Sequence, residues 1–290
     1  MAEHLAAEAF AKVNLGLVVD SRGSDGYHPL VSLAQSVSWA DHLTLSHGDQ
    51  DAFTAGGMDA DDNNLAWQAV MAARAVASSA GRVVLNLEKS IPAAAGLGGG
   101  SADAAATLGL TAELLGVAPG DLPVLALELG ADVPFCLAGG LAVLEGRGEK
   151  VSARPAAGTF ALAIVVPPVE LSTPAVYSRW DEMGEPTGIA VSASHIPPGL
   201  RPFQPLRNDL QPAAEALAPE VAEWRDELAT RWQRPVAMTG SGPALFAYFV
   251  DEDEAVSAVE DRPDRARAAR AVVPVSQGWR RVPGTLAGPE

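Results

Sequence analysis

The residues with the plainest chemical capacity are the glycines of the stretch GLGGGS, residues 96–101. They stand directly ahead of an alanine-rich run of helical character that Ser101 heads. The start of a helix leaves about four backbone N–H groups unpaired and carries the positive end of the helix dipole. Because glycine has no Cβ, phosphate oxygens can approach these amides closely. The pattern predicts a phosphate cradle, in which Ser101 caps the helix or offers its hydroxyl group to a phosphate or to Mg²⁺.

Two common phosphate-binding loops do not fit this stretch. A P-loop ends in Gly-Lys-Ser or Gly-Lys-Thr, and no lysine stands at that place. A dinucleotide-binding loop needs a glycine where Ser101 stands and follows the first strand of a βαβ unit. A flexible linker is the remaining alternative, but glycines clustered before a strong helix favour the phosphate cradle.

Three further polar stretches lie in apolar surroundings. Lys12 and Asn14 are two residues apart in the strand-like run AKVNLGLVV and therefore face the same side. Asp132 follows a predicted helix and a glycine, and a Gly-Ser-Gly turn occupies residues 240–242. Taken alone, a strand lysine more often lies at a sheet edge and an aspartate in such a place more often belongs to a turn or a cap. The Gly-Ser-Gly turn by itself indicates only a tight connection.

The elements that must position these residues follow from apolar periodicity and turn residues. The composition shifts near residues 150–158, where we expect a boundary between a β-rich first half with helices and an α+β second half. Strands are predicted on both sides of a polar turn within 7–30, at 41–46, 82–89 and 160–171, on both sides of the turn at 240–242, and at 270–276; helices are predicted at 63–81, 101–115, 120–130 with Asp121 as its cap, 219–232, and in a charged segment after 250.

Composition excludes several classes of protein. The chain has 290 residues, with 36 acidic and 20 basic side chains and a formal net charge of −16, which argues against general binding to nucleic acids or anionic membranes. The single cysteine, Cys136, excludes a disulfide framework and a multi-cysteine metal site. No basic leader precedes an apolar run, and no segment approaches 18 unbroken apolar residues. We therefore expect a soluble, cytoplasmic protein.

Together, the motifs resemble the GHMP kinase superfamily and, within it, the family of 4-diphosphocytidyl-2-C-methyl-D-erythritol kinases. The resemblance covers nearly the whole chain and is weakest at 184–205 and beyond 250. The motifs that carry it are AKVNLGL (11–17), GYHPLVSLAQSV (26–37), IPAAAGLGGGSADAA (91–105), LGADVPFCLAGG (129–140) and MTGSGPALFA (238–247).

The resemblance implies an α+β protein with the two-domain GHMP kinase fold. Its N-terminal domain is expected to be like domain 2 of ribosomal protein S5, and its C-terminal domain to be ferredoxin-like. On this basis residues 1–152 form the domain with the ATP loop and the catalytic residues, 153–282 form the second domain, and 283–290 form a tail.

The resemblance also implies the reaction, which is transfer of the γ-phosphoryl group of ATP, with Mg²⁺, to the 2-hydroxyl group of the cytidyl substrate. Asp132 would be the general base and Lys12 its partner. A cation within ~4–6 Å favours the ionised carboxylate and can stabilise a developing alkoxide. The metal ligands stay unassigned. The residues expected to bind ATP are Pro92, Gly96, Leu97, Gly98, Gly99, Gly100 and Ser101, together with Lys89 and Asn64.

Substrate choice is expected to depend on a pocket for the cytosine ring. In the family, the base is stacked between two aromatic rings and hydrogen-bonded by a histidine, and stacking is worth ~1–3 kcal/mol per base. Tyr27 and His28 match one side of that pocket, whereas Thr173 and Tyr177 match the other. The full set of substrate-side residues is Asn14, Tyr27, His28, Thr173 and Tyr177, and the C-terminal glycine turn consists of Gly240, Ser241 and Gly242.

The chain departs from the family pattern inside the glycine loop. Ala102 and Asp103 stand where many relatives have Ser-Asn, and Ala93 and Ala94 replace glycines at the entry. A carboxylate near phosphates is unfavourable unless it faces Mg²⁺ or stabilises the first helical turn. We expect Asp103 to stabilise the helix start.

Two alternatives stay open. The first is another small-alcohol kinase of the superfamily, such as mevalonate or homoserine kinase, but those substrates offer no base to stack. The second is a nucleotide-binding protein of the same fold without catalysis, although Lys12 and Asp132 are both present. A dinucleotide-dependent oxidoreductase fits poorly. The expected partners are small molecules, with neither nucleic acid nor membrane, in a monomer or homodimer.

Overall fold

The computed structural model describes residues 4–56, 63–79, 81–188, 193–203 and 207–283. Its strands are β1 His4–Val19, β2 Leu30–His47, β3 Ala52–Ala55, β4 Val83–Glu88, β5 Leu141–Gly146, β6 Lys150–Arg154, β7 Ala161–Val166, β8 Ala237–Met238, β9 Leu245–Phe249, β10 Ala268–Val272 and β11 Trp279–Val282. Its α-helices are α1 Leu65–Val76, α2 Gly99–Leu115, α3 Leu122–Leu129, α4 Val133–Ala138, α5 Thr173–Glu182, α6 Gln211–Leu217, α7 Glu220–Trp232 and α8 Glu252–Glu260, and 3₁₀ helices span Pro119–Asp121, Ala193–His195 and Pro198–Phe203.

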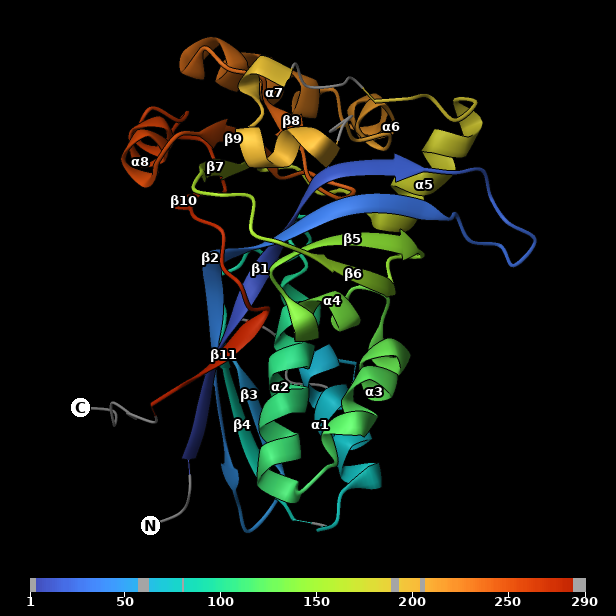
Figure 1. Cartoon of the computed structure of the whole chain (residues 1–290), viewed down its shortest axis with the longest axis vertical. Coiled ribbons are helices and arrows are strands. Elements are labelled where there is room, and N and C mark those ends of the chain that lie inside the picture. The colour runs from blue at the N-terminus through green and yellow to red at the C-terminus, as the bar shows by residue number, and fades with distance from the viewer. Residues whose placement is uncertain (1–3, 57–62, 80, 189–192, 204–206, 284–290) are drawn as a thin grey trace.

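The first layer is a seven-stranded sheet with helices α1 to α4 on one face (Figure 1). Its strand order is β11-β1-β2-β4-β3, and β5 pairs with β2 and with β6. Leu5 and Leu45 of the sheet pack with Leu108 of α2 and Phe135 of α4 in one buried cluster. Burial of these apolar side chains is what holds the four helices against the sheet.

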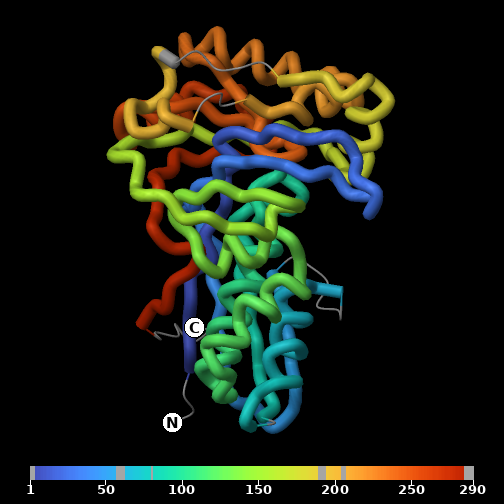
Figure 2. Tube along the Cα trace, turned by 45° about the vertical axis from the view of Figure 1, so that its right-hand side comes forward, coloured from blue at the N-terminus to red at the C-terminus, as the bar shows by residue number. Residues whose placement is uncertain are grey.

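β1 and β2 form one long antiparallel hairpin that runs from the first layer into the second (Figure 2). The segment 41–46, which the sequence predicted as a separate strand, is the second half of β2. The reason is a bulge: Ala11 pairs with Val37 but Phe10 pairs with Ala40, so two residues of β2 are left out of the register and the strand continues. One half of β2 then pairs with β5 and the other with β4.

The second layer is an antiparallel sheet of order β10-β7-β9-β8. The predicted buried strand in 160–171 is β7, and all six of its residues are buried. Its side chains alternate between two apolar clusters. Ala163 and Val165 pack with Trp180 and Trp224 of the covering helices, whereas Ile164 packs with residues of β1 and β2. Since both faces are covered, a continuous apolar run is what this strand requires.

The described topology crosses the expected domain limits at two places. β6 runs to Arg154, so a boundary after residue 152 falls inside that strand. β11 pairs with β1 in the first sheet, although it lies in the stretch expected to form the second domain. The division into domains 1–152 and 153–282 therefore stays a prediction. The predicted tail, 283–290, lies outside the described residues except for Pro283.

Candidate active site

A cleft of about 1280 Å³ gathers the side chains and loops that the sequence singled out. Both sheets contribute to its wall, because the cleft runs past β1, the start of α2, the start of α5 and the turn after β8. Gly242 of the C-terminal turn does not line it. The predicted residues that do are Lys12, Asn14, Tyr27, His28, Asn64, Lys89, Pro92, Gly96, Leu97, Gly98, Gly99, Gly100, Ser101, Asp132, Thr173, Tyr177, Gly240 and Ser241.

Lys12 and Asp132 meet in this cleft. The Nζ atom of Lys12, on β1, donates a hydrogen bond of 2.6 Å to Oδ1 of Asp132. Asp132 precedes α4 but makes no side-chain capping bond, so its carboxylate is directed to the lysine rather than to the helix. The lysine side chain is buried, whereas that of Asp132 is 39% exposed. The pair thus combines a sheltered cation with a carboxylate that a solute can reach.

The glycine loop passes directly over Lys12. The backbone N–H of Lys12 donates to the carbonyl of Leu97 at 2.8 Å. Gly98 has a φ of 66°, a left-handed conformation, and a Cβ there would lie 3.4 Å from Cβ of Lys12. α2 begins at Gly99, so the predicted start at Ser101 was wrong and Ser101 lies in the first turn. The left-handed cap lets the chain enter the helix here, and the first-turn amides have no partner within the helix.

The C-terminal glycine turn braces the glycine loop from the other sheet. A Cβ on Gly96 would come within 2.6 Å of the carbonyl oxygen of Thr239, and Ala244 N–H donates to the carbonyl of Ala95 at 3.1 Å. The Thr239 hydroxyl oxygen also accepts a bond of 2.8 Å from the backbone of Asn14. The two loops therefore pack backbone against backbone, which explains why both are rich in glycine.

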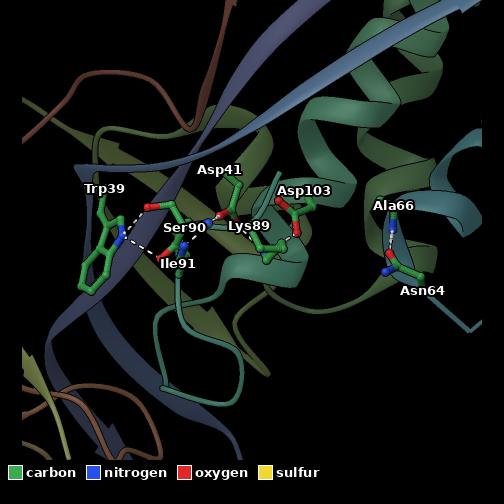
Figure 3. A network of polar contacts seen from close by, with 8 residues as sticks. All are labelled: Trp39, Asp41, Asn64, Ala66, Lys89, Ser90, Ile91 and Asp103. Atoms are coloured by element: carbon green, nitrogen blue, oxygen red, sulfur yellow. Dashed lines mark hydrogen bonds and ion pairs between the residues drawn. The ribbon is translucent and has the colours of Figure 1, made fainter. Parts of the chain in front are cut away.

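A second lysine, Lys89, lies under the same loop and is held by two carboxylates (Figure 3). Its ammonium group donates to Asp41 and, at 2.6 Å, to Asp103. Asp41 is fully buried and also accepts from the backbone N–H groups of Ser90 at 2.5 Å and Ile91 at 2.8 Å. Asp103 therefore takes part in an ion-pair cluster, and the expectation that it stabilises the helix start was wrong. Asp103 lies on the buried face of α2, and its side chain faces Lys89, which follows β4.

The charges of this cluster do not balance, since one ammonium group serves two buried carboxylates. The Oδ1 atom of Asp103 has no hydrogen-bond partner. Burial, with the nearby charge of Asp41, raises the pKa of Asp103 to about 7, against the lowering effect of Lys89. Burial alone would lower the pKa of Lys89, but the charges of Asp103 and Asp41 hold that pKa above its usual value.

The aromatic side of the cleft is arranged differently from the expectation. The ring of His28 stacks on Tyr177, with centroids 5.3 Å apart and planes at 25°, so His28 lies on the side of Tyr177 rather than with Tyr27. Its Nε2 atom is 3.3 Å from Oδ1 of Asp181. Burial, with the charge of Asp132, raises the pKa of Tyr177 to about 12. Tyr27 is 54% exposed and stands apart at the rim of the cleft.

Several residues in or beside the cleft were not found from the sequence. Asp41 and Asp181 gave no signal, because they lie inside the regular elements β2 and α5 and outside the recognised motifs. Arg147 lies in a glycine-flanked turn soon after the LGADVPF motif, and its guanidinium carbon stands 3.6 Å from the centroid of the Tyr27 ring. A positive charge in a glycine-flanked turn is the signal that could have pointed to Arg147.

The described residues offer neither a cluster of metal ligands nor a membrane-spanning helix. Among the described residues, no three His, Cys, Asp or Glu side chains are grouped so that they could hold a metal ion. No helix in the described part of the chain is both long and apolar enough to span a membrane.

Comparison with known proteins agrees with the motifs. The family model "GHMP kinases N terminal domain" matches residues 64–140. Proteins named 4-diphosphocytidyl-2-C-methyl-D-erythritol kinase from Sinorhizobium medicae (strain WSM419) and Moorella thermoacetica (strain ATCC 39073 / JCM 9320) are each 38% identical to this chain. The first alignment covers 88% of this chain and 90% of the relative, and the second covers 87% and 92%.

Solved structures give the same result. A crystal structure of 4-(cytidine 5'-diphospho)-2C-methyl-D-erythritol kinase superposes with a TM-score of 0.80 at 35% identity, covering 93% of this chain and 98% of that one. A homoserine kinase from Cytophaga hutchinsonii, 20% identical with a TM-score of 0.70 and covering 97% and 98% of the two chains, shares the fold. The chain is thus an α+β protein with the GHMP kinase fold, and it belongs to the family of 4-diphosphocytidyl-2-C-methyl-D-erythritol kinases.

Proposed function

We propose that this kinase transfers the γ-phosphoryl group of ATP to the 2-hydroxyl group of 4-diphosphocytidyl-2-C-methyl-D-erythritol, a step of the non-mevalonate route to isoprenoid precursors. The observation that carries the proposal is the ion pair of Lys12 and Asp132 in a cleft with a glycine loop on one side and an aromatic cluster on the other. Phosphoryl transfer needs little beyond positioning, charge neutralisation and a proton acceptor, and these features supply each of them.

Asp132 is the proposed proton acceptor. Its carboxylate is partly open to the cleft, and one of its oxygens is engaged by Lys12. The substrate hydroxyl would donate its proton to this carboxylate as the oxygen attacks the phosphorus atom. The buried ammonium group of Lys12 stabilises negative charge on the carboxylate and on the developing alkoxide.

ATP is the proposed phosphoryl donor, bound at the start of α2. The amides from Gly96 to Ser101 would hold the phosphates, because the helix dipole and the unpaired N–H groups both favour an anion there. Asn64 caps α1, accepting from Ala66 at 3.0 Å, which fixes it at the cleft wall. Lys89 supports the loop from beneath, since a Cβ on Gly99 would lie 3.4 Å from its Nζ atom. Pro92 and Leu97 complete the proposed ATP site.

The donor groups of the cleft fit a Mg²⁺ ion that arrives with the nucleotide. Ser101 and Glu128 line the cleft and offer oxygen donors, and in the described part of the chain no three His, Cys, Asp or Glu side chains form a metal cage. Mg²⁺ at phosphoryl-transfer sites is usually held by one or two protein oxygens plus the substrate phosphates. Ser101 and Glu128 would hold the ion here, and when bound it would neutralise charge on the phosphates.

The cytidyl substrate is proposed to lie along the aromatic side. Tyr27, His28 and Tyr177 would bind the base, and Thr173, which lies 2.7 Å from Ser241 through their hydroxyl oxygens, would close that end of the cleft. Asn14 would bind the polyol. Its side-chain amide donates to Ser32 at 2.6 Å, while its Oδ1 atom is buried without a partner at the cleft and can accept from a substrate hydroxyl.

The test is ADP release with Mg·ATP and a panel of acceptors: the cytidyl-diphosphate methylerythritol, mevalonate and homoserine. Turnover of the cytidyl substrate alone, lost in Asp132→Asn, is the expected result. Turnover of mevalonate or homoserine instead would keep the fold and reject the cytosine pocket. Binding of ATP without turnover of any acceptor would indicate a non-catalytic protein.

We further infer a cytoplasmic enzyme that acts on small molecules as a monomer or homodimer. The lone buried cysteine and the net charge of −16 support this inference. Cell fractionation and light scattering of the purified chain would test it.

A further inference from the structure

The turn between β5 and β6 joins the two ends of the substrate side of the cleft. Its Arg147 places a guanidinium group over the ring of Tyr27, 3.6 Å from the centroid. Its next residue, Gly148, approaches the other end, because a Cβ on Gly148 would lie 3.7 Å from Oδ1 of Asp132. One short turn thus touches both the exposed tyrosine at the rim and the proposed general base.

Arg147 differs from the two lysines of the cleft in how its charge is compensated. Among the described residues, Lys12, Lys89, Arg22 and Arg147 are the lysines and arginines that line the cleft. The two lysines are buried and held by carboxylates of the protein interior or the reaction centre. Arg147 is 47% exposed, and its carboxylate partner is Asp25, at 2.8 Å and 55% exposed.

In an exposed ion pair of this kind, an anionic ligand can readily replace the carboxylate. Ion pairs between solvent-exposed side chains contribute little, because water and salt screen the charges. The hydrogen bond from Arg147 lowers the pKa of Asp25, so Asp25 is an anion at neutral pH and competes with any anionic ligand. A guanidinium group stacked on an aromatic ring keeps its N–H donors at its edge, where they suit the paired oxygens of a phosphate.

We propose that Arg147 binds the diphosphate group that joins the cytidine and the polyol of the substrate, exchanging Asp25 for phosphate oxygens. The inference rests on the proposed function, because it takes the base to lie near Tyr27 and the reacting hydroxyl near Asp132. The linking group of such a substrate has to pass between these two ends, and the turn that carries Arg147 reaches both of them. Arg147 is a binding residue in this account and takes no part in the proton transfer.

The test compares two probes, cytidine and cytidine 5'-diphosphate, by titration calorimetry with the full chain. Wild-type protein is expected to bind the diphosphate more tightly than the nucleoside. Arg147→Met removes the charge but keeps an apolar stem over Tyr27, and it should weaken diphosphate binding roughly 10- to 100-fold, the range for hydrogen bonds to a charged group. Binding of cytidine should not change. Arg147→Lys should recover part of the loss.

Two further variants sharpen the test. Asp25→Asn removes the competing anion and should tighten binding of the diphosphate by up to about fivefold, the scale of an exposed ion pair. Arg154→Met is the matched control, because Arg154 lies in the same β5–β6 hairpin and is exposed, and among the described residues its side chain bonds only to the carbonyl of Ala153. That variant should bind both probes as the wild type does.

Four outcomes would overturn the inference. If Arg147→Met leaves diphosphate binding unchanged, Arg147 does not contact the phosphates. If the variant weakens cytidine and the diphosphate equally, Arg147 only holds Tyr27 in place. If Asp25→Asn weakens binding as much as Arg147→Met, the pair acts as a structural latch. Wild-type protein that binds neither probe would reject the cytosine pocket of the proposed function, and the inference with it.

Discussion

Two lysine–aspartate sites border one glycine loop, and they differ in how exposed their carboxylates are. Lys12 faces a single carboxylate, Asp132, which is 39% exposed. Lys89 faces two, Asp41 and Asp103, whose side chains are 0% and 3% exposed. A carboxylate that a ligand can reach can exchange a proton with it, whereas a carboxylate closed inside the protein can only hold the fold together. We therefore propose that the same pair of residue types serves catalysis at one site and stability of the fold at the other.

The largest expected effect is the loss of activity when the Lys12–Asp132 pair, whose carboxylate is partly exposed, is changed. Asp132→Asn should lower kcat by roughly 10²- to 10⁴-fold, the usual contribution of a general base, with little change in the melting temperature. Steady-state ADP release and thermal unfolding of the same preparation would measure both. The matched control is Asp226→Asn, an exposed aspartate on α7. If Asp132→Asn lowers the melting temperature markedly as well as kcat, Asp132 also supports the fold and the contrast between the two sites fails.

The closed cluster should respond in the opposite way. Lys89→Met leaves two buried carboxylates without their cation, and breaking a buried ion pair on one side costs about 3–5 kcal/mol of unfolding free energy. Urea unfolding would measure the loss, with Lys150→Met, an exposed lysine of β6, as control. Adding Asp103→Asn to Lys89→Met should restore part of the stability, because it removes one uncompensated charge. A loss below about 1 kcal/mol would mean that the cluster does not hold the loop.

A smaller effect on stability should distinguish Gly98, which lies next to Lys12, from Gly99, which lies next to Lys89. Gly98→Ala forces a left-handed conformation on a residue with a Cβ and should cost about 1–2 kcal/mol, next to Lys12. Gly99→Ala has no such backbone cost, although its Cβ would lie 3.0 Å from Ile91. Chemical unfolding and the KM for ATP would compare the two variants. A larger stability loss in Gly99→Ala would show that packing against Ile91, and not the backbone, limits this loop.

The subtlest difference is in pH dependence. The raised pKa of Asp103, about 7 against an ordinary value of 3.8, means that the folded protein binds a proton more readily than the unfolded chain. The stability that this group contributes is full below pH 4 and is lost as the pH rises through 7. Asp103→Asn removes this dependence. The variant should therefore gain on the wild type in melting temperature between pH 5 and pH 8, and a gap that stays constant would contradict the raised pKa.

The sequence predicted the open site better than the closed one for a physical reason. Lys12 and Asp132 lie in motifs with a family resemblance, so their meeting could be expected although 120 residues separate them. Asp41 lies just past the bulge that lets β2 continue, where local sequence predicted a new strand. Its pairing with Lys89 depends on that register, which no local pattern reveals.

The fold was predictable where burial is local. The apolar run of β7 and the amphipathic helices α1 and α7 appear in the sequence as periodic patterns. The short helices α5 and α6, and strand β11, did not, because each is stabilised by distant partners. β11, for example, is positioned by its pairing with β1. The start of α2 at Gly99 was missed because glycine is a poor helix former, and here the loop's packing overrides that preference.

The β1–β2 hairpin has a mechanical consequence. β1 spans 16 residues, about 50 Å of extended chain. It contributes Leu5 to the buried cluster between the first sheet and its helices, Val13 to the cluster that contains Ile164, and Leu17 to the cluster that contains Trp180 and Trp224. Enzymes built from two lobes often close by a hinge, but a hinge here would have to break the antiparallel pairing of β1 with β2, which extends on both sides of Lys12. The β1–β2 hairpin therefore fixes the two sheets relative to each other. We expect substrates to enter a cleft that is already shaped, with adjustment confined to side chains at the rim.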